Sequence, residues 1–448
     1  MRYDLLVRGG TVCASDGERE ADVGILDGKI EAIGDLSQAE AAEVLDAGGL
    51  HILPGIIDTQ VHFREPGMEH KEDLESGTRA AIMGGVTTIF EMPNTSPPTT
   101  SMEALEDKLR RAQGRAWCDH AFFVGAALDN LDQLAELERL PGTPGIKIFM
   151  GSSTGSLLVP DDESLRQVLL AGRRRCPIHA EDHQRLEERK ALLSPDPHVR
   201  EHPYVRDVEC ARRATERILD LSREAGRAVH ILHLSTLDEI PLIRRAKMEG
   251  LGTSVEITPQ HLYFSEQDYE RLGTRLQMNP PIRSKEHRDA LRHALREGFF
   301  DMVGSDHAPH TIEEKERPYP LSPSGMPGVQ TLVPVMLTLV DQGLLSLREF
   351  VRLSSESPAS LYGLLGKGKI EAGFDADLCI VDLWRTEPVR REWLQSKCGW
   401  SPYENEMLRG WPVHVVLRGQ IVVREGELQG GPVGLPARFK DLGSERAL

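Results

Sequence analysis

Six side chains that can bind a metal ion recur along this chain, each within or just after a short apolar stretch. Three are histidines and the others are a glutamine, a lysine and an aspartate: Gln60, His62, Lys147, His179, His233 and Asp306. Neutral imidazole and carboxylate groups suit Zn²⁺. A lysine amine that reacts with CO₂ becomes a carbamate, which is an anionic oxygen ligand able to bridge two metal ions. Together these groups could hold one or two zinc ions that activate water for hydrolysis.

The stretches that carry these residues alternate with helix-like segments. Eight strand-like stretches occur; the first lies at 55–64 and the others begin near 86, 120, 145, 176, 228, 253 and 301. Eight strands that are each followed by a helix predict an α/β fold, a (β/α)8 TIM-like barrel, rather than a doubly wound sheet. The C-terminal ends of barrel strands face one mouth, so residues spread over almost 250 positions would meet there.

The expected helices and loops follow from periodicity and capping residues. Helices are predicted at 71–83, 101–111, 162–175, 207–225, 237–249 and 284–297, and Ser101 is the expected N-cap of the second. Two long loops, 183–206 and 311–327, are rich in charge or proline, and we expect them to line the mouth as lids or walls.

Both ends of the chain have the pattern of antiparallel strands. Strand-like runs separated by glycine or aspartate turns occur at 4–12, 21–26 and 29–34, and again at 377–382 and 412–423. We therefore expect residues 1–54 and 368–448 to form one small β-sandwich beside a barrel domain of residues 55–367.

Charge and composition restrict the partners. The net charge of -17 argues against nucleic acid, which requires a basic face. A small anionic substrate stays compatible because a site creates its own local field. The six cysteines form no CxxC pair, which indicates free thiols in a reducing compartment. With no signal-peptide core and no apolar run of 18 residues, a cytoplasmic protein without a membrane partner is expected.

Each candidate ligand also has an ordinary structural interpretation. A single histidine can be a hydrogen-bonded core residue, Lys147 could pair with a carboxylate at the rim, and Asp306 could cap the next helix. His230 is three residues from His233 in one strand, so it faces the opposite side and is expected to be structural.

The set of motifs resembles the dihydroorotases of the cyclic amidohydrolase group, which also includes hydantoinases and allantoinases. The matching segments extend over nearly the whole chain: Pro54-Gly-Ile-Ile-Asp58, His62-Phe-Arg-Glu-Pro-Gly67, Glu91-Met-Pro-Asn-Thr95, Gly145-Ile-Lys147, His233-Leu-Ser-Thr236, Asn279-Pro-Pro-Ile-Arg283 and Ser305-Asp-His-Ala-Pro-His310. The resemblance implies a zinc enzyme that interconverts dihydroorotate and N-carbamoyl-aspartate in pyrimidine biosynthesis, with Asp306 as the proton shuttle. It also implies a homo-oligomer, a dimer or a tetramer.

The resemblance further assigns the substrate contacts. Arg64, Asn94 and His310 match the residues that bind the substrate carboxylate, a group that hydantoin and allantoin lack at that position. Asn279 and the backbone near Gly325 and Met326 would contact the ring amide by the same analogy. Without the resemblance, Arg64 could equally form a surface ion pair with Glu65 or Glu75.

One position departs from the usual pattern. Most relatives have His-x-His at the end of the first strand, whereas this chain has Gln60-Val-His62. An amide oxygen is a weaker zinc ligand than imidazole, so the metal beside His62 and Asp306 should bind less tightly or be absent. Two alternatives stay open: a hydantoinase or allantoinase, and a non-catalytic relative that serves as an assembly partner.

Overall fold

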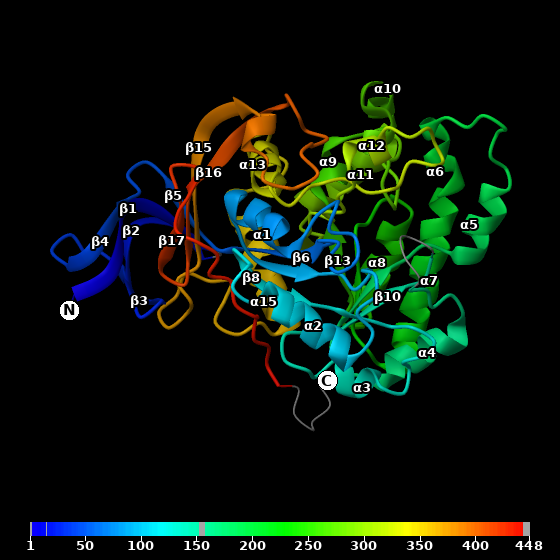
Figure 1. Ribbon diagram of the computed structural model, residues 1–448, viewed down its shortest axis with the longest axis horizontal. Coiled ribbons are helices and arrows are strands. Elements are labelled where there is room, and N and C mark those ends of the chain that lie inside the picture. Colours follow the sequence, from blue (N-terminus) through cyan, green and yellow to red (C-terminus); the bar gives the residue numbers. More distant parts are fainter. Residues whose placement is uncertain (1, 15, 152–156, 442–448) are drawn as a thin grey trace.

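The predicted barrel is present in the computed structural model, which describes residues 2–14, 16–151 and 157–441 (Figure 1). Parallel strands form two sheets whose order follows the sequence. The first contains β6 (Ile56–Val61), β7 (Val86–Glu91) and β8 (Asp119–Phe122); the second contains β9 (Val124–Gly125), β10 (Ile146–Phe149), β11 (Cys176–His179), β12 (Val229–Ile231), β13 (Ser254–Ile257) and β14 (Met302–Val303). A parallel bridge between Val61 and His307 closes the ring.

Helices separate the strands at most of the expected positions. They are α1 (Leu74–Met83), α2 (Met102–Ala112), α3 (Leu134–Leu137), α4 (Asp162–Ala171), α7 (Val208–Ala225), α8 (Glu239–Met248), α9 (Pro259–Tyr263), α10 (Tyr269–Leu272) and α11 (Lys285–Arg296). The Ser101 hydroxyl accepts a hydrogen bond from Ala104 N, which confirms it as the N-cap of α2.

The two segments expected to be loops are partly helical. Residues 183–206 contain α5 (His183–Lys190), the 3₁₀ turn η1 (Val199–Glu201) and α6 (His202–Val205), and residues 311–327 contain α12 (Ile312–Lys315). Side chains cap two of these helices: Asp182 accepts from Arg185 N and Thr311 accepts from Glu314 N. Short capped helices thus form where charge and proline content suggested irregular chain.

The segment after the barrel is mainly helical. It contains α13 (Leu332–Asp341), α14 (Leu347–Val351), the π-helical turn η4 (Arg352–Glu356) and α15 (Ser357–Tyr362). Every residue of α13 from Leu332 to Leu339 is buried, so this helix lacks the one-sided apolar stripe that sequence patterns reveal. Short 3₁₀ turns elsewhere are η2 (Glu266–Asp268), η3 (Gly273–Leu276) and η5 (Arg391–Trp393).

Strands from the two ends of the chain share one nine-stranded sheet, as predicted. Its order is β18-β17-β16-β15-β5-β1-β2-β3, with β4 beside β1. The members are β1 (Arg2–Ala14), β2 (Gly17–Leu26), β3 (Lys29–Gly34), β4 (Glu40–Asp46), β5 (His51–Pro54), β15 (Leu378–Pro388), β16 (Met407–Leu417), β17 (Gln420–Arg424) and β18 (Glu427–Leu428). Figure 1 shows the N-terminal strands, in blue, beside the orange and red C-terminal strands.

The link between the two ends is the antiparallel pair of β5 and β15. Ile52 lies opposite Ile380, and both belong to a buried apolar cluster that also contains Leu5, Val23 and Val416. This shared core confirms a β domain built from both termini, and we propose 1–54 and 368–448 as its boundaries around a barrel of 55–367. Within the described residues, no helix is both long and apolar enough to cross a membrane.

A buried lysine joins this β domain to the barrel. Lys367 Nζ lies 2.7 Å from Asp119 Oδ2, 2.5 Å from Asp377 Oδ2 and 3.2 Å from Asp375 Oδ2. Asp119 begins β8 of the barrel, whereas Asp375 and Asp377 precede β15. The carboxylates hold the pKa of Lys367 above its usual range despite burial, so the ammonium is retained at the junction.

Removing this ammonium should destabilise the fold. Lys367→Met leaves the three carboxylates short of a cation, and breaking such a buried ionic cluster costs about 3–5 kcal/mol. Urea unfolding followed by circular dichroism should show a clearly lower midpoint than in the wild type. Lys369→Met is the matched control, because this exposed lysine makes only distant contacts, 3.6 Å from Glu371 and 6.0 Å from the centre of the Phe374 ring. It should change stability by less than about 0.5 kcal/mol. Equal midpoints for both variants would contradict the prediction.

Candidate functional site

The six candidate ligands lie at the C-terminal mouth of the barrel. Gln60 and His62 stand at the end of β6, Lys147 within β10, and His179 at the end of β11, while His233 and Asp306 follow β12 and β14. All six side chains are buried. His179 Nδ1 lies 3.0 Å from His233 Nε2, and Asp306 Oδ1 lies 3.0 Å from Gln60 Nε2 and 3.2 Å from His62 Nε2. Lys147 is near enough to Asp306 for the carboxylate to raise its pKa against the larger effect of burial. The structure therefore brings residues from five strands together.

His179 and His233 present ring nitrogens to one another. His179 Nδ1 lies 3.0 Å from His233 Nε2, and His179 Nε2 lies 2.8 Å from Glu181 Oε2. Burial alone would raise the pKa of Glu181, but the guanidinium of Arg206 lowers it to about 2. The ionised Glu181 fixes the proton of His179 on Nε2, so the lone pair of Nδ1 faces His233.

This pair suits a tetrahedral metal ion. Zinc bonds of about 2.0–2.1 Å place two ligand nitrogens roughly 3.3 Å apart, close to the observed 3.0 Å. Burial lowers the pKa of His179 and takes that of His233 well below its usual range. Both rings are therefore neutral, as metal ligands must be.

Lys147 is a buried amine whose Nζ has no hydrogen-bond partner in the part of the chain that the structure describes. Its nitrogen lies 4.4 Å from the centre of the Phe149 ring, and burial takes its pKa well below the usual range. The alternative of a lysine hydrogen-bonded to a rim carboxylate is thus not what the structure shows. A neutral amine is the form that reacts with CO₂, so the site fits a carbamate at this position.

Lys147 matters because the histidines beside it supply only two metal ligands. Across residues 2–14, 16–151 and 157–441, no three His, Cys, Asp or Glu side chains gather in a group able to hold a metal ion. The two histidines supply two ligands, and a third ligand from this region would have to come from a modified Lys147. The residues therefore fit a metal centre only with the carbamate included.

A second pair of facing electron donors involves His62 and Asp306. His62 Nδ1 lies 2.6 Å from Asn94 Oδ1, and since an amide oxygen only accepts, the ring proton is on Nδ1. Burial lowers the pKa of His62, which keeps the ring neutral. The lone pair of His62 Nε2 then faces Asp306 Oδ1 at 3.2 Å. His62 Nε2 thus presents a lone pair that a cation would satisfy, beside a carboxylate oxygen that also accepts from Gln60 Nε2.

Gln60 behaves as a hydrogen-bond donor in this structure. Its Nε2 donates to Asp306 Oδ1 at 3.0 Å, whereas Oε1 is buried and has no hydrogen-bond partner among the described residues. The nitrogen of an amide is no metal ligand. In this structure Gln60 therefore contacts the Asp306 carboxylate directly, as a donor.

Arg64 is buried and has no salt bridge to a carboxylate in the described part of the chain. Its Nε donates to Pro309 O at 3.0 Å, and its Nη2 lies 3.2 Å from His310 Nε2. The alternative ion pair with Glu65 is not formed, because Glu65 accepts from Arg115 at 2.8 Å. Burial lowers the pKa of Arg64 to about 10, so the guanidinium is still charged at neutral pH. The charges of nearby carboxylates, Asp306 first, raise this pKa against the effect of burial without forming a direct contact. A buried guanidinium with no salt bridge to a described carboxylate favours an anionic ligand.

Two residues predicted to contact the substrate already form hydrogen bonds within the protein. Asn279 Oδ1 lies 3.0 Å from His202 Nε2. Gly325 N donates to Gln277 O at 2.9 Å, so only the Gly325 carbonyl can meet a ring N–H. Gly325 has φ of 135°, and a Cβ there would lie 2.5 Å from Ala308 O. Glycine is thus required where the 311–327 segment approaches the loop after β14.

Three site residues adopt the left-handed backbone region that side chains other than glycine disfavour. They are Arg64, His233 and Asp306, with φ of 61°, 35° and 45°. Each follows the end of a strand, where a sharp turn directs the side chain into the mouth. Such local strain persists where the surroundings impose it, and it is concentrated at functional sites.

Sequence analysis missed Glu256 and His261, which also reach the site. Glu256 lies within β13, accepts a hydrogen bond from His233 N at 3.2 Å, and has a pKa raised by burial to about 8. His261, in α9, has its Nδ1 2.8 Å from Thr258 Oγ1 and a buried Nε2 without a partner. An ionisable residue inside an apolar strand, the pattern that identified Lys147, would also have identified Glu256.

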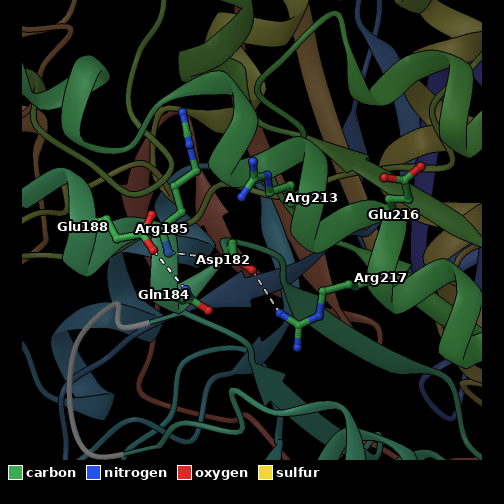
Figure 2. A pocket seen from close by; sticks show the side chains of 7 residues that line it. All are labelled: Asp182, Gln184, Arg185, Glu188, Arg213, Glu216 and Arg217. Atoms are coloured by element: carbon green, nitrogen blue, oxygen red, sulfur yellow. Dashed lines mark hydrogen bonds and ion pairs between the residues drawn. The ribbon is translucent and has the colours of Figure 1, made fainter.

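A separate cavity of about 280 Å³ lies between α5 and α7 (Figure 2). It is lined by Asp182, Gln184, Arg185, Glu188, Arg213, Glu216 and Arg217. Asp182 accepts from Arg217 Nη1 at 3.0 Å and from Arg185 N at 2.9 Å. This cavity contains none of the candidate ligands, and its arginines are already paired: Arg217 with Asp182, Arg185 with Asp207 and Arg213 with Glu209.

Comparison with known proteins places this geometry in a family context. The amidohydrolase family model matches residues 51–422. A dihydroorotase of Methanosarcina acetivorans is 38% identical over 441 residues, covering 96% of this chain and 94% of the relative. An allantoinase of Deinococcus radiodurans is 34% identical, covering 99% and 100%. The solved structure of an L-hydantoinase (dihydropyrimidinase) from Arthrobacter aurescens superposes with a TM-score of 0.92 at 32% identity, covering 97% and 99%.

Restoring the histidine at position 60 should increase metal content. Gln60→His replaces the amide that donates to Asp306 with an imidazole ligand, so metal bound per chain should rise towards two. Elemental analysis after dialysis against a weak chelator measures the ratio, and wild type prepared in parallel is the reference. Two equally tight metal ions in the wild type would count against this reading of Gln60.

Proposed function

Since the chain belongs to the amidohydrolase family, we propose that it is a metal-dependent dihydroorotase, which interconverts dihydroorotate and N-carbamoyl-aspartate in pyrimidine biosynthesis. The observation that carries this substrate assignment is the buried, unmatched guanidinium of Arg64. Dihydroorotate has a carboxylate beside its cyclic amide, and a guanidinium with two neighbouring donors suits that group. Dihydroorotases at 33–38% identity among the relatives support the same assignment.

Two sets of residues would hold zinc. Lys147, as its carbamate, would join His179 and His233 at one position, and His62 and Asp306 at a second, weaker one. When bound there, zinc lowers the pKa of a water molecule to about 7 and polarises the amide carbonyl.

The protein residues would perform the remaining tasks. Asp306 is placed to accept a proton from the attacking water and to deliver it to the ring nitrogen as the C–N bond breaks. Arg64, Asn94 and His310 would orient the ring through its carboxylate. Asn94 would have two roles, because its Oδ1 fixes the proton of His62 while its amide N–H groups suit the substrate.

The alternatives are weaker on specific grounds. A hydantoinase or allantoinase would leave Arg64 without an anionic partner, although relatives with those names are 34–36% identical. A non-catalytic assembly partner is supported only by Gln60, whereas Lys147, His179, His233 and Asp306 retain their chemistry. The homo-oligomer stays a prediction.

Substrate choice gives the sharpest test. Arg64→Met should reduce kcat/KM for dihydroorotate at least about tenfold, because a charge-assisted hydrogen bond contributes roughly 1.5–3 kcal/mol. Turnover of a neutral cyclic amide such as dihydrouracil or hydantoin should change little, since it has no carboxylate to lose. Both proteins are assayed on both substrates at matched metal content. Equal losses on both would mean that Arg64 maintains the site, and a wild type that prefers hydantoin would move the assignment to hydantoinase.

A further inference from the structure

Lys71 contacts the substrate side of the site from behind His310. Its Nζ lies 3.1 Å from His310 Nδ1 and 3.1 Å from Glu314 Oε1. The side chain is largely buried, with 12% exposed. His310 therefore stands between two cations, with Lys71 at one ring nitrogen and Arg64 Nη2 at the other.

The chemistry of an ammonium group determines the tautomer of His310. An ammonium has three donors and no acceptor, so Nδ1 must accept from Lys71. Burial lowers the pKa of His310 to about 3, hence the ring is neutral and holds one proton. Ser324 O, which only accepts, lies 3.0 Å from Nε2 and, together with Lys71, favours the proton on Nε2. Arg64 Nη2 also only donates and lies 3.2 Å from Nε2, so this contact favours the opposite tautomer, with the proton on Nδ1.

The Nε2–H tautomer makes Nε2 a donor on the same side as the Arg64 guanidinium. The two donor nitrogens, His310 Nε2 and Arg64 Nη2, are only 3.2 Å apart. A bound carboxylate would take over the Nε2–H that now faces Ser324 O and would accept from Arg64 Nη2 with its other oxygen. If the proton moved to Nδ1, Nε2 would become an acceptor, and its lone pair would repel an anion.

We propose that Lys71 is a positioning residue that holds His310 as its Nε2–H tautomer and thereby completes the carboxylate-binding donors. This inference rests on the proposed function for its substrate, but the tautomer is a property of the protein alone. Glu314 keeps Lys71 in place. The other nearby lysine, Lys315, is directed elsewhere, because its Nζ donates to Gln277 O and Pro323 O.

The tautomer can be read directly in the full-length protein. Nitrogen-15 histidine labelling with long-range ¹H–¹⁵N spectra distinguishes protonated from bare ring nitrogens, and His310→Asn assigns the signal. Wild type should show a protonated Nε2. Lys71→Met should shift the proton population towards Nδ1, where Glu314 Oε2 lies 3.7 Å away. Lys71→Arg, which retains a cationic donor, should restore the wild-type pattern.

Kinetics then connect the tautomer to specificity. Lys71→Met should lower kcat/KM for dihydroorotate about tenfold, mainly through KM, and change dihydrouracil turnover less than about twofold, since one charge-assisted contact is lost. Lys190→Met, at an exposed lysine of α5 that pairs with Glu187, is the control and should leave both the spectra and the rates unchanged.

The outcomes separate the two claims. An unchanged Nε2–H signal in Lys71→Met overturns the role of Lys71, whatever the substrate. A shifted signal with equal losses on both substrates also overturns it, because Lys71 would then act on the site as a whole. A wild type that does not turn over dihydroorotate refutes the proposed function, while the spectra still decide the tautomer.

Discussion

Desolvation at the barrel mouth is the constraint on which the rest of the site depends. Burial disfavours charge, so it lowers the pKa of Lys147, His62 and His179 and raises that of Glu256. The result is a group of neutral nitrogens with lone pairs, which is the form that binds metal or reacts with CO₂. The barrel that buries the strands thus also sets the protonation states of the residues at their ends.

Burial does not neutralise Arg64, which lies on the proposed substrate side. A guanidinium has so high an ordinary pKa that burial leaves it charged, with a pKa of about 10. Desolvation therefore neutralises the lysine of the metal side but only strengthens the attraction exerted by the arginine. One buried environment thus contains neutral nitrogens, which fit the proposed metal ligands, and a charged guanidinium, which fits the proposed substrate carboxylate. The side-chain type decides between the two.

Sequence patterns predicted what depends on the chain locally. Apolar runs that end in a polar residue located the barrel strands, and the strand texture at both ends predicted the shared sheet. α13 was missed because it is apolar on every side, and β4 because it is largely exposed. Lys71 could not be found, since a charged loop residue is ordinary and its contact with His310 joins positions 239 residues apart. Which ring nitrogen of His310 is protonated, and whether Arg64 has a carboxylate partner, depend on contacts between residues far apart in the sequence. Neither can therefore be predicted from the sequence alone.

Gln60 is consistent with an adapted site rather than a decayed one. Loss of function normally removes several ligands, because nothing retains the others once the first has gone. Here the amide replaces one imidazole and at the same time donates to Asp306, the carboxylate that would carry the proton. Its hydrogen bond orients that carboxylate without adding charge. We therefore expect the amide at position 60 to weaken the metal site beside His62 while it keeps the Asp306 carboxylate oriented.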